Sequence, residues 1–328
     1  MLIRPSKLRR LGIMGMNDRN INYIARYNPR RLYPLVDNKL KTKLIAEEAG
    51  ITVPPLIGAI RTQHDLEDVA DMVAGHAGFA IKPAKGSGGK GILVITGHKD
   101  GRFIKSSGVQ IGMSAIRHHI TNVLSGLYSL GGSPDVAIIE SLILTDPRYE
   151  PWSIGGVPDI RVIVYRGFPV MAMMRLATRA SDGKANLHMG AVGVGLDIVS
   201  GRAVNAVQSG GAVTEHPDSG NQLGELTVAD WDQYLELGAR CADVTGLGYL
   251  GADIVPDRNH GAMLIELNAR PGLAIQVANR RGLKHRVRAI DKLPADAFKK
   301  PSADRCRIAC EVITSVEATV VPEPESSQ

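Results

Sequence analysis

The 328-residue chain has few cysteines, few aromatic side chains and no long apolar run. Its three cysteines form no CxxC pair and no metal-ligand spacing, which argues against a disulfide framework and indicates a reducing, cytoplasmic compartment. Aromatic residues make up 4%, so stacking platforms for single-stranded nucleic acid are scarce. No apolar stretch approaches the roughly 18–20 residues of a membrane helix, so we expect no membrane insertion.

The composition contains enough apolar residues for a core and an uneven distribution of charge. Hydrophobic residues make up 44% and charged residues 22%, which is typical of a globular chain of one large or two modest domains. The net charge is +6. Residues 1–43 carry eleven Lys/Arg against two acids, and residues 280–307 carry ten against three. Basic ends can contact nucleic acid, an acidic protein or an anionic substrate, or can be plain solvated surface; few aromatics make nucleic acid the weaker candidate.

Helical and extended patterns alternate along the chain. Asp37 is the expected N-cap of a helix over 37–50 that ends at Gly50, and Thr227 is the expected cap of a helix over 227–247. Further helices are predicted over 64–77 and 111–131. Strands are predicted over 79–83, 92–96, 136–143, 159–178 as a pair around Gly167, and 248–257 with 261–272 as a hairpin. Residues 179–222 indicate loops with short strands, and 320–328 have a disordered composition. Helices mixed with antiparallel strand pairs predict the α+β class.

A glycine-rich segment, Gly86-Ser87-Gly88-Gly89-Lys90-Gly91, fits GxGxxG. A Rossmann loop would need a helix directly afterwards, but the β-branched ILVIT follows. A P-loop would need Ser or Thr after the lysine, but Gly91 stands there. Kinase HRD and DFG motifs do not occur. Two readings remain: a flexible surface turn, or a hairpin whose backbone N–H groups cover phosphates while Lys82 reaches them as a point charge.

Three oxygen-bearing side chains converge on the hairpin near residue 260. Glu266 and Asn268 are two apart on one strand, so they share a face, while Ile265 and Leu267 point to the other. Asp253 lies on the preceding strand and should stand opposite residues 265–266. Such a set suits Mg²⁺, or Mn²⁺ as a second hard cation, with nucleotide phosphates and water completing the coordination. The alternative is a solvated polar strand face.

The order NKL, IKP with a glycine loop, IIES, DIRV, NLHMG, GADIV and IELNARPGL resembles ATP-grasp carboxylate–amine ligases. It is most similar to RimK-type alpha-L-glutamate ligases, over roughly residues 36–280. The resemblance implies an ATP-grasp fold, in which two α+β subdomains clasp ATP, with a shortened N-terminal region. The implied division is a short basic segment 1–35, subdomain 1 over 36–143, subdomain 2 over 144–290 and a C-terminal extension 291–328.

The resemblance also implies roles for individual residues. The expected nucleotide-binding set consists of phosphate lysines, the mobile loop, the adenine hinge and two polar neighbours: Lys39, Lys82, Gly86, Ser87, Gly88, Gly89, Glu140, Ser141, Leu142, Ile143, Asp159 and Asn186. The expected metal ligands are Asp253, Glu266 and Asn268, and the expected catalytic residues are Arg175 and Arg270. Structural alternatives stand beside these roles. Arg161 and Arg175 could pair with Asp159 or another acid, Arg270 could pair with Glu266, and His188 could be a packed loop residue.

These observations predict an ATP- and Mg²⁺-dependent ligase that forms an acyl phosphate and adds glutamate, or another amino acid, to an unidentified acceptor. Two alternatives remain. One is an ATP-grasp phosphotransferase; the other is a catalytically silent module that binds nucleotide or polyanions. Because the N-terminal region is short, the acceptor could be a small molecule, a protein or a peptide, and a partner protein could complete its pocket. A homo-oligomer is a further possibility.

Overall fold

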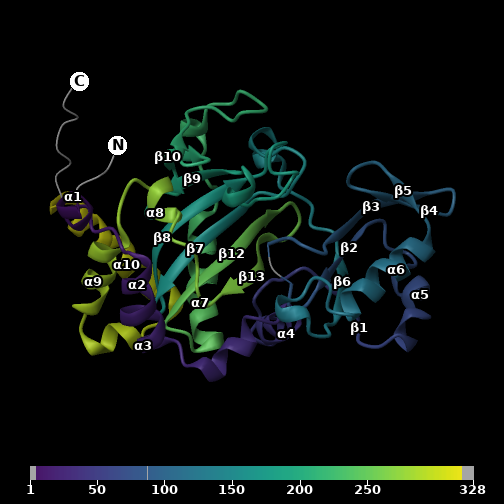
Figure 1. Ribbon diagram of the computed structural model, residues 1–328. Helices are drawn as coiled ribbons and strands as arrows, with labels where there is room; N and C mark the ends of the chain where they lie inside the picture. The colour runs from purple at the N-terminus through teal and green to yellow at the C-terminus, as the bar shows by residue number, and fades with distance from the viewer. Residues whose placement is uncertain (1–4, 87, 320–328) are drawn as a thin grey trace.

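The computed structural model describes residues 5–86 and 88–319, which form two antiparallel sheets with helices around them (Figure 1). One sheet has six strands and the other has seven. This arrangement confirms the α+β class. Ser87 and the tail 320–328 lie outside the described residues. No helix in the described ranges combines the length and apolar character that a membrane span requires.

The smaller sheet has the strand order β1-β6-β2-β3-β4-β5, and every neighbouring pair is antiparallel. Its core contains Phe79, Ile81 and Ile139, which pack with Ile116 and Ile120 of the covering helix α6. The strands are β1 (Leu56–Ile60), β2 (Phe79–Pro83), β3 (Leu93–Lys99), β4 (Arg102–Lys105), β5 (Gln110–Ile111) and β6 (Ala137–Ser141).

The larger sheet has the order β11-β10-β9-β8-β7-β12-β13. Helix α7 packs on one face, where Gly238 lies against Val162 and Val164. Because side chains alternate along a strand, Asp159 and Arg161 point to the opposite face. The strands are β7 (Asp159–Tyr165), β8 (Phe168–Leu176), β9 (Val192–Leu196), β10 (Ala203–Gln208), β11 (Gly211–Ala212), β12 (Tyr249–Asp257) and β13 (Gly261–Asn268).

Ten α-helices and several short helical turns connect the strands in the described part of the chain. The α-helices are α1 (Pro5–Arg10), α2 (Met16–Asp18), α3 (Ala25–Tyr27), α4 (Lys39–Glu48), α5 (Val69–Val73), α6 (Met113–Leu124), α7 (Trp231–Thr245), α8 (Ile275–Ala278), α9 (Leu283–Asp291) and α10 (Ser302–Thr319). The turns are η1 (Arg19–Ile24), η2 (Arg30–Leu35), η3 (His64–Leu66), η4 (Leu130–Gly132), η5 (Pro147–Trp152), η6 (Leu187–Met189), η7 (Leu223–Glu225) and η8 (Ala295–Lys299).

The N-terminal helices pack on the larger sheet beside the C-terminal helices (Figure 1). Met14, Tyr23 and Ile24 are buried in its core. Asn28 fixes the end of this segment, because its side-chain amide donates to the carbonyls of Tyr249 (2.6 Å) and Ala269 (3.0 Å). Long-range packing therefore orders a stretch that shows no clean hydrophobic period.

Two predicted helix caps are wrong. Asn38, and not Asp37, caps α4, because its side chain accepts the N–H of Lys41 (3.1 Å). Thr227 lies in a β-bridge with Arg202, and α7 begins only at Trp231.

Two predicted helices are too long. The segment 64–77 is interrupted, and Asp65 accepts the backbone N–H groups of Arg61 and Thr62, which competes with helix formation at its start. The helix predicted over 111–131 ends at Leu124, just before Gly126 at a φ of 84°.

The predicted register of the β12–β13 hairpin is confirmed, since Asp253 stands directly opposite Glu266. A bulge follows, because the next pair is Ile254 with Leu264. Ile265 is the extra residue and is half-buried, whereas Leu267 joins the core. The prediction that Ile265 packs like Leu267 is therefore wrong. The bulge turns Ile265 toward the space between the two sheets.

Candidate functional site

A row of charged side chains crosses the larger sheet on the face opposite α7. Arg175 on β8 stands across from Asp159 on β7, and Arg161 on β7 stands across from Asp253 on β12. Arg161 donates to both Asp253 oxygens, at 2.7 and 2.6 Å. Paired charges of both signs therefore occupy neighbouring strands in one line.

Arg175 joins the two carboxylates of this row. It forms a bidentate pair with Asp159, and its Nη2 lies 2.9 Å from Asp253 Oδ2. Asn268 Nδ2 donates to the same Asp253 oxygen at 3.2 Å. The predicted alternative that Arg161 and Arg175 pair with acids is thus what the structure contains.

Burial and the two arginines act on the carboxylates in opposite directions. Burial raises the pKa of Asp159, and the neighbouring Asp253 raises it further against the opposing effect of Arg175. Burial also tends to raise the pKa of Asp253, but Arg161 and Arg175 together outweigh it and leave that pKa below its ordinary value. Asp253 therefore carries the firmly held negative charge, and Asp159 is the carboxylate that protonates more readily.

Lys39 connects the two sheets at the edge of this row. Its Nζ donates to the carbonyl of Gly86, at 2.6 Å, and to Glu266 Oε1, at 3.0 Å. Gly86 belongs to the glycine loop that follows β2, whereas Glu266 lies on β13. The Lys39 backbone N–H also donates to Ala84 O at 2.8 Å. The first helical residue of α4 thus holds both the loop and the acidic hairpin.

A second cluster of charges lies behind Lys39. Lys82 on β2 forms an ion pair with Glu140 on β6, and Lys43 on α4 lies 3.0 Å from the other Glu140 oxygen. Lys43 also donates to the Pro54 carbonyl. All three charged side chains are at most 10% exposed. Lys43 was not among the predicted site residues, because its place one turn after Lys39 on α4 gives no indication that it is buried.

The three lysines line one recess between the sheets. It is narrow, with a cavity volume of about 10 Å³, which is room for about one water molecule. Besides Lys39, Lys43 and Lys82, its walls contain Thr42, Val53, Pro54, Leu264 and Ile265. The bulged Ile265 thus supplies apolar surface beside the cations. Cations beside apolar walls suit the phosphate end of a ligand, but the recess is far smaller than the roughly 300–1,000 Å³ of a pocket that encloses a whole small molecule.

The glycine loop, residues 84–91, is anchored at both ends. The Lys85 N–H donates to Asp135, and His119 Nε2 lies 3.0 Å from the Gly91 carbonyl. Gly91 has a φ of 75°, and a Cβ there would lie 2.4 Å from the Tyr128 ring. Gly88 and Gly89 also have positive φ values. Glycine is therefore required at the base of the loop by packing and at its tip by conformation.

The predicted hinge, residues 140–143, comprises the last two residues of β6 and the two residues after it. The Glu140 carboxylate is occupied by lysines, and the Ser141 N–H donates to Pro55 O at 2.9 Å. Leu142 and Ile143 are half-buried and lead to Leu144, whose N–H donates to Asp257 on β12. The segment leads from the smaller sheet to the larger one, and its role as the adenine hinge stays a prediction.

Asn186 lies between β8 and β9 and caps η6, since its Oδ1 accepts the N–H of exposed His188 at 3.0 Å. The side chain of nearby Lys184 lies beside Gly89, since a Cβ added at Gly89 would be 3.5 Å from Lys184 Cδ. The segment after β8 therefore reaches across to the tip of the glycine loop. The predicted alternative of a packed His188 is wrong.

Arg270 lies apart from the charged row. Its guanidinium lies over the ring of Tyr33, 5.1 Å from the ring centre, and it is exposed. Glu266 pairs with Lys39 instead. Stacking on an aromatic face holds a guanidinium flat while its N–H edge stays available to an anion.

The acidic hairpin fits a metal ion through two of its three predicted ligands. Glu266 has a side chain that is 32% exposed, and Asn268 is half-buried next to it. Asp253 is 3% exposed and already accepts N–H groups from Arg161 at both oxygens. Among the described residues no three His, Cys, Asp or Glu are grouped as a ready metal cage. Two ligands leave room for phosphate and water, which is the usual arrangement for Mg²⁺.

Comparisons with known proteins agree with this architecture. A family model described as sugar-transfer associated ATP-grasp matches residues 18–292. None of the curated proteins compared with the chain matches it. The closer likeness to RimK-type glutamate ligases stays a prediction.

Three solved structures illustrate the similarity. The ATP-grasp ligase PsnB, complexed with minimal precursor, is 14% identical at a TM-score of 0.42, covering 88% of this chain and 64% of PsnB. D-alanine–D-alanine ligase from Bacillus anthracis, complexed with ATP, is 12% identical at 0.43, covering 88% and 69%. D-cycloserine synthetase DcsG is 13% identical at 0.45, covering 87% and 73%. The chain thus spans less than two thirds of PsnB.

The family model covers well over half of the chain, and its ATP-grasp description confirms the fold expected from the motifs. The chain belongs to the sugar-transfer associated ATP-grasp family.

Proposed function

We propose that this protein is an ATP-dependent ligase that activates a carboxylate as an acyl phosphate and joins it to an amine. The observation that carries the proposal is the position of Lys39, which contacts the glycine loop and the acidic hairpin at the same time. An ammonium at that point faces the place where a phosphate chain would lie between loop and hairpin. Membership of an ATP-grasp family supports the same reading.

The nucleotide would lie between the two sheets, with its phosphates at the mouth of the recess near Lys39 and Lys82, and the sheets would have to part to admit it. Lys82 is paired with Glu140, and Lys43 shares that carboxylate. Because two lysines share one acid, the cluster keeps a net positive charge for an anionic ligand. Mg²⁺, held by Glu266 and Asn268, would neutralise the β- and γ-phosphates when bound. Asp253 as a third ligand stays a prediction.

The chemistry would proceed in two balanced steps. A carboxylate oxygen forms a bond to the γ-phosphorus as the bond to the bridging oxygen breaks, which releases ADP. An amine then attacks the acyl carbon, inorganic phosphate leaves, and the amine loses a proton. Arg175 is largely but not fully buried and is oriented by Asp159 and Asp253, so it would meet the transferring phosphoryl group without reorganisation. Arg270, stacked on Tyr33, would orient an anionic group of the substrate.

The glycine loop would exclude water. An acyl phosphate hydrolyses readily, so a closed site favours amide formation over loss of the intermediate. The loop is anchored at Asp135 and His119, and its tip lies close to Lys184 from the larger sheet. Closure therefore needs movement only in the tip.

The proposal gives the chemical class of the substrates, a carboxylate and an amine, and does not identify them. Glutamate as the added amino acid stays a prediction, and so does the acceptor. The described side chains would select an anionic group, but they do not select the length of the molecule that carries it. The phosphotransferase alternative shares the first step but gives no amide. The silent-module alternative requires nucleotide binding without turnover.

ADP release with Mg²⁺, ATP and pooled amino acids tests the proposal. We expect release that depends on amino acids, and Glu266→Gln should lower the rate by about 10²–10³-fold, because it weakens both the metal and the Lys39 contact. Glu311→Gln changes an exposed carboxylate on α10 in the same way and should leave the rate unchanged. Nucleotide binding without any turnover, or a Glu266→Gln enzyme as fast as the control, would refute the ligase.

A further inference from the structure

The two basic ends of the chain meet on one face of the molecule. The N–H groups of Gly282 and Lys284 donate to the carbonyls of Leu11 (3.1 Å) and Gly12 (2.9 Å). His285 Nε2 lies 2.9 Å from the Arg10 carbonyl. The start of α9 is therefore docked on the end of α1, and stretches more than 250 residues apart in sequence form one surface.

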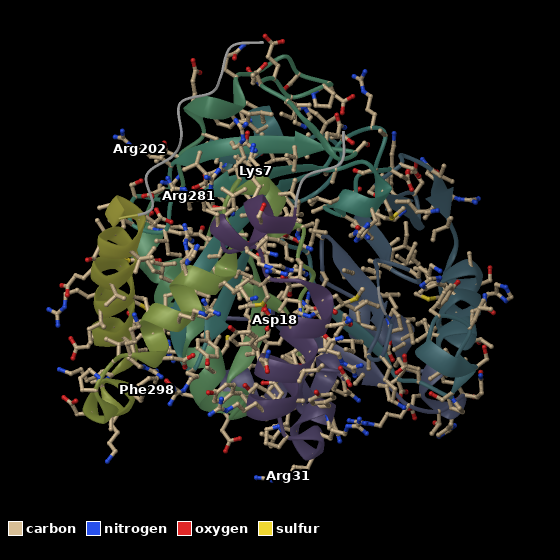
Figure 2. The ribbon with its side chains drawn as sticks, turned by 60° about the vertical axis from the view of Figure 1, so that its left-hand side comes forward. Lys7, Asp18, Arg31, Arg202, Arg281 and Phe298 are labelled. Carbon is tan, nitrogen blue, oxygen red and sulfur yellow. The ribbon has the colours of Figure 1, made fainter. Side chains whose placement is uncertain are left out.

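This surface carries strong charge of one sign. Residues 5–31 contain seven Lys/Arg and one acid, Asp18, and residues 280–290 contain five Lys/Arg and no acid. Arg19 and Arg286 among them are buried, and Glu317 of α10 pairs with Arg281 and Arg286, so the charge of this surface comes from the remaining basic residues. Asp18 is already paired with Lys284 at 2.6 Å. Figure 2 shows Lys7 and Asp18 along the N-terminal helices, with Arg31 at their far end. The exposed basic residues of the surface include Lys7, Arg9, Arg26, Arg30, Arg31 and Arg288.

Apolar side chains lie between these charges and point outward. Met16 is 64% exposed and Ile21 is 67% exposed, which are among the highest values for large apolar residues in the described chain. Leu11 is 37% exposed. The inner side of the same helical stretch buries Tyr23 and Ile24 in the core. The other exposed positions between residues 15 and 22 are Gly15, Asn17, Asn20 and Asn22, which carry no charge, and the half-buried Asp18 is paired with Lys284.

The combination distinguishes between polyanions. The phosphates of nucleic acid would attract the basic side chains, but exposed Met16 and Ile21 would add no affinity for them. Aromatic residues that could stack on bases are also few. A bilayer with anionic lipid interacts favourably with both kinds of side chain. Its headgroups attract Lys and Arg, and the boundary with the acyl chains accepts apolar side chains. Exposed apolar side chains bordered by basic residues are the pattern of a surface that lies on a membrane without crossing it.

We propose that the face formed by α1, the helical stretch 16–27 and the start of α9 docks on an anionic lipid surface. Met16 and Ile21 enter the headgroup boundary, and Lys7, Arg9 and Arg288 contact the lipid phosphates. These helices lie on the side of the larger sheet that faces away from the smaller sheet (Figure 1). The docked protein therefore keeps the space between the two sheets accessible. The proposal does not depend on the reaction that the site performs.

Flotation with vesicles tests this surface. Full-length protein is mixed with vesicles of phosphatidylcholine alone, or with 30% phosphatidylglycerol. We expect binding only to the second kind, and binding that weakens as salt rises. Lys7→Glu/Arg9→Glu and, separately, Met16→Ser/Ile21→Ser should each lower the partition coefficient at least about tenfold.

Matched variants elsewhere control for charge and hydropathy. Lys99→Glu/Arg102→Glu reverses two exposed charges on the smaller sheet, and Val109→Ser removes an exposed apolar side chain there. Both should bind like the parent, with all variants checked for an unchanged unfolding temperature. No binding to phosphatidylglycerol vesicles overturns the proposal. So does binding that survives Met16→Ser/Ile21→Ser while a DNA duplex binds equally well, because the surface would then be a general polyanion site.

Discussion

Replacement of Lys43 by methionine examines the buried charge cluster behind the candidate phosphate site. The Lys43 side chain is 4% exposed, and its ammonium lies between Glu140 and the Pro54 carbonyl. Burial is the largest effect on its pKa and lowers it, and Glu140 only partly restores it. A cation in such a place persists because its partners hold it. Methionine keeps the length of the side chain and removes the charge.

The expected cost follows from what the substitution leaves behind. Removing one partner of a buried ion pair costs about 3–5 kcal/mol. Glu140 keeps Lys82 as a partner, so the lower limit of about 3 kcal/mol applies. With an unfolding entropy of about 2.1 cal/mol/K per residue, this loss lowers the unfolding temperature by about 4 °C. Lys82 would then neutralise Glu140 alone, so ATP should also bind more weakly.

Urea and thermal unfolding measure the first effect, and the KM for ATP measures the second. Lys41→Met is the control, since Lys41 is exposed on the same helix and its loss should change the free energy of unfolding by less than about 0.5 kcal/mol. If Lys43→Met unfolds at the same urea concentration as Lys41→Met, the ammonium is not a structural partner of Glu140, and the reasoning fails.

Two further predictions concern the glycine loop and pH. Gly91→Ala places a side chain at a φ of 75° and against Tyr128, so it should destabilise the fold by about 2–4 kcal/mol. Gly88→Ala places a side chain at a φ of 64° in open space, so it should cost only about 1 kcal/mol. Urea unfolding measures both changes. Burial lowers the pKa of His119 and of His216 below 6.5. At these two histidines the unfolded chain therefore binds more protons than the folded one below about pH 6.5, so they should lower the free energy of unfolding as pH drops from 7 to 5, whereas Asp159, whose pKa is raised, acts in the opposite direction. A double His→Gln variant with the same pH slope would contradict this assignment.

Local patterns in the sequence predict the elements that depend on neighbours in the chain. The strand Phe79–Pro83 appears with its predicted bounds, and the hairpin places Asp253 opposite Glu266. Strand alternation and a short turn fix both features within a few residues. The position of Glu266 and Asn268 beside each other was therefore accessible from the sequence.

Contacts between distant segments were not accessible in this way. Arg161 and Asp253 are 92 residues apart and meet only because β7 pairs with β12 in one register. Lys43 and Glu140 meet because α4 lies between the sheets, and a lysine on a helix gives no indication of burial. The cap of α4 was placed one residue early, since Asp37 and Asn38 are both good capping residues and only geometry decides between them.

The central claim is that the protein transfers the γ-phosphoryl group of ATP to a carboxylate in the space between the two sheets. Positional isotope exchange tests it directly, with ATP carrying ¹⁸O in the β–γ bridge, Mg²⁺ and a pool of N-acetylated amino acids, which offer carboxylates but no free amine. Reversible acyl phosphate formation lets the bridge oxygen of bound ADP exchange positions before ATP re-forms. We predict carboxylate-dependent scrambling that Glu266→Gln abolishes. The account would be contradicted if ATP binds but its label stays in the bridge with every carboxylate of the pool and also with a small-molecule cell extract.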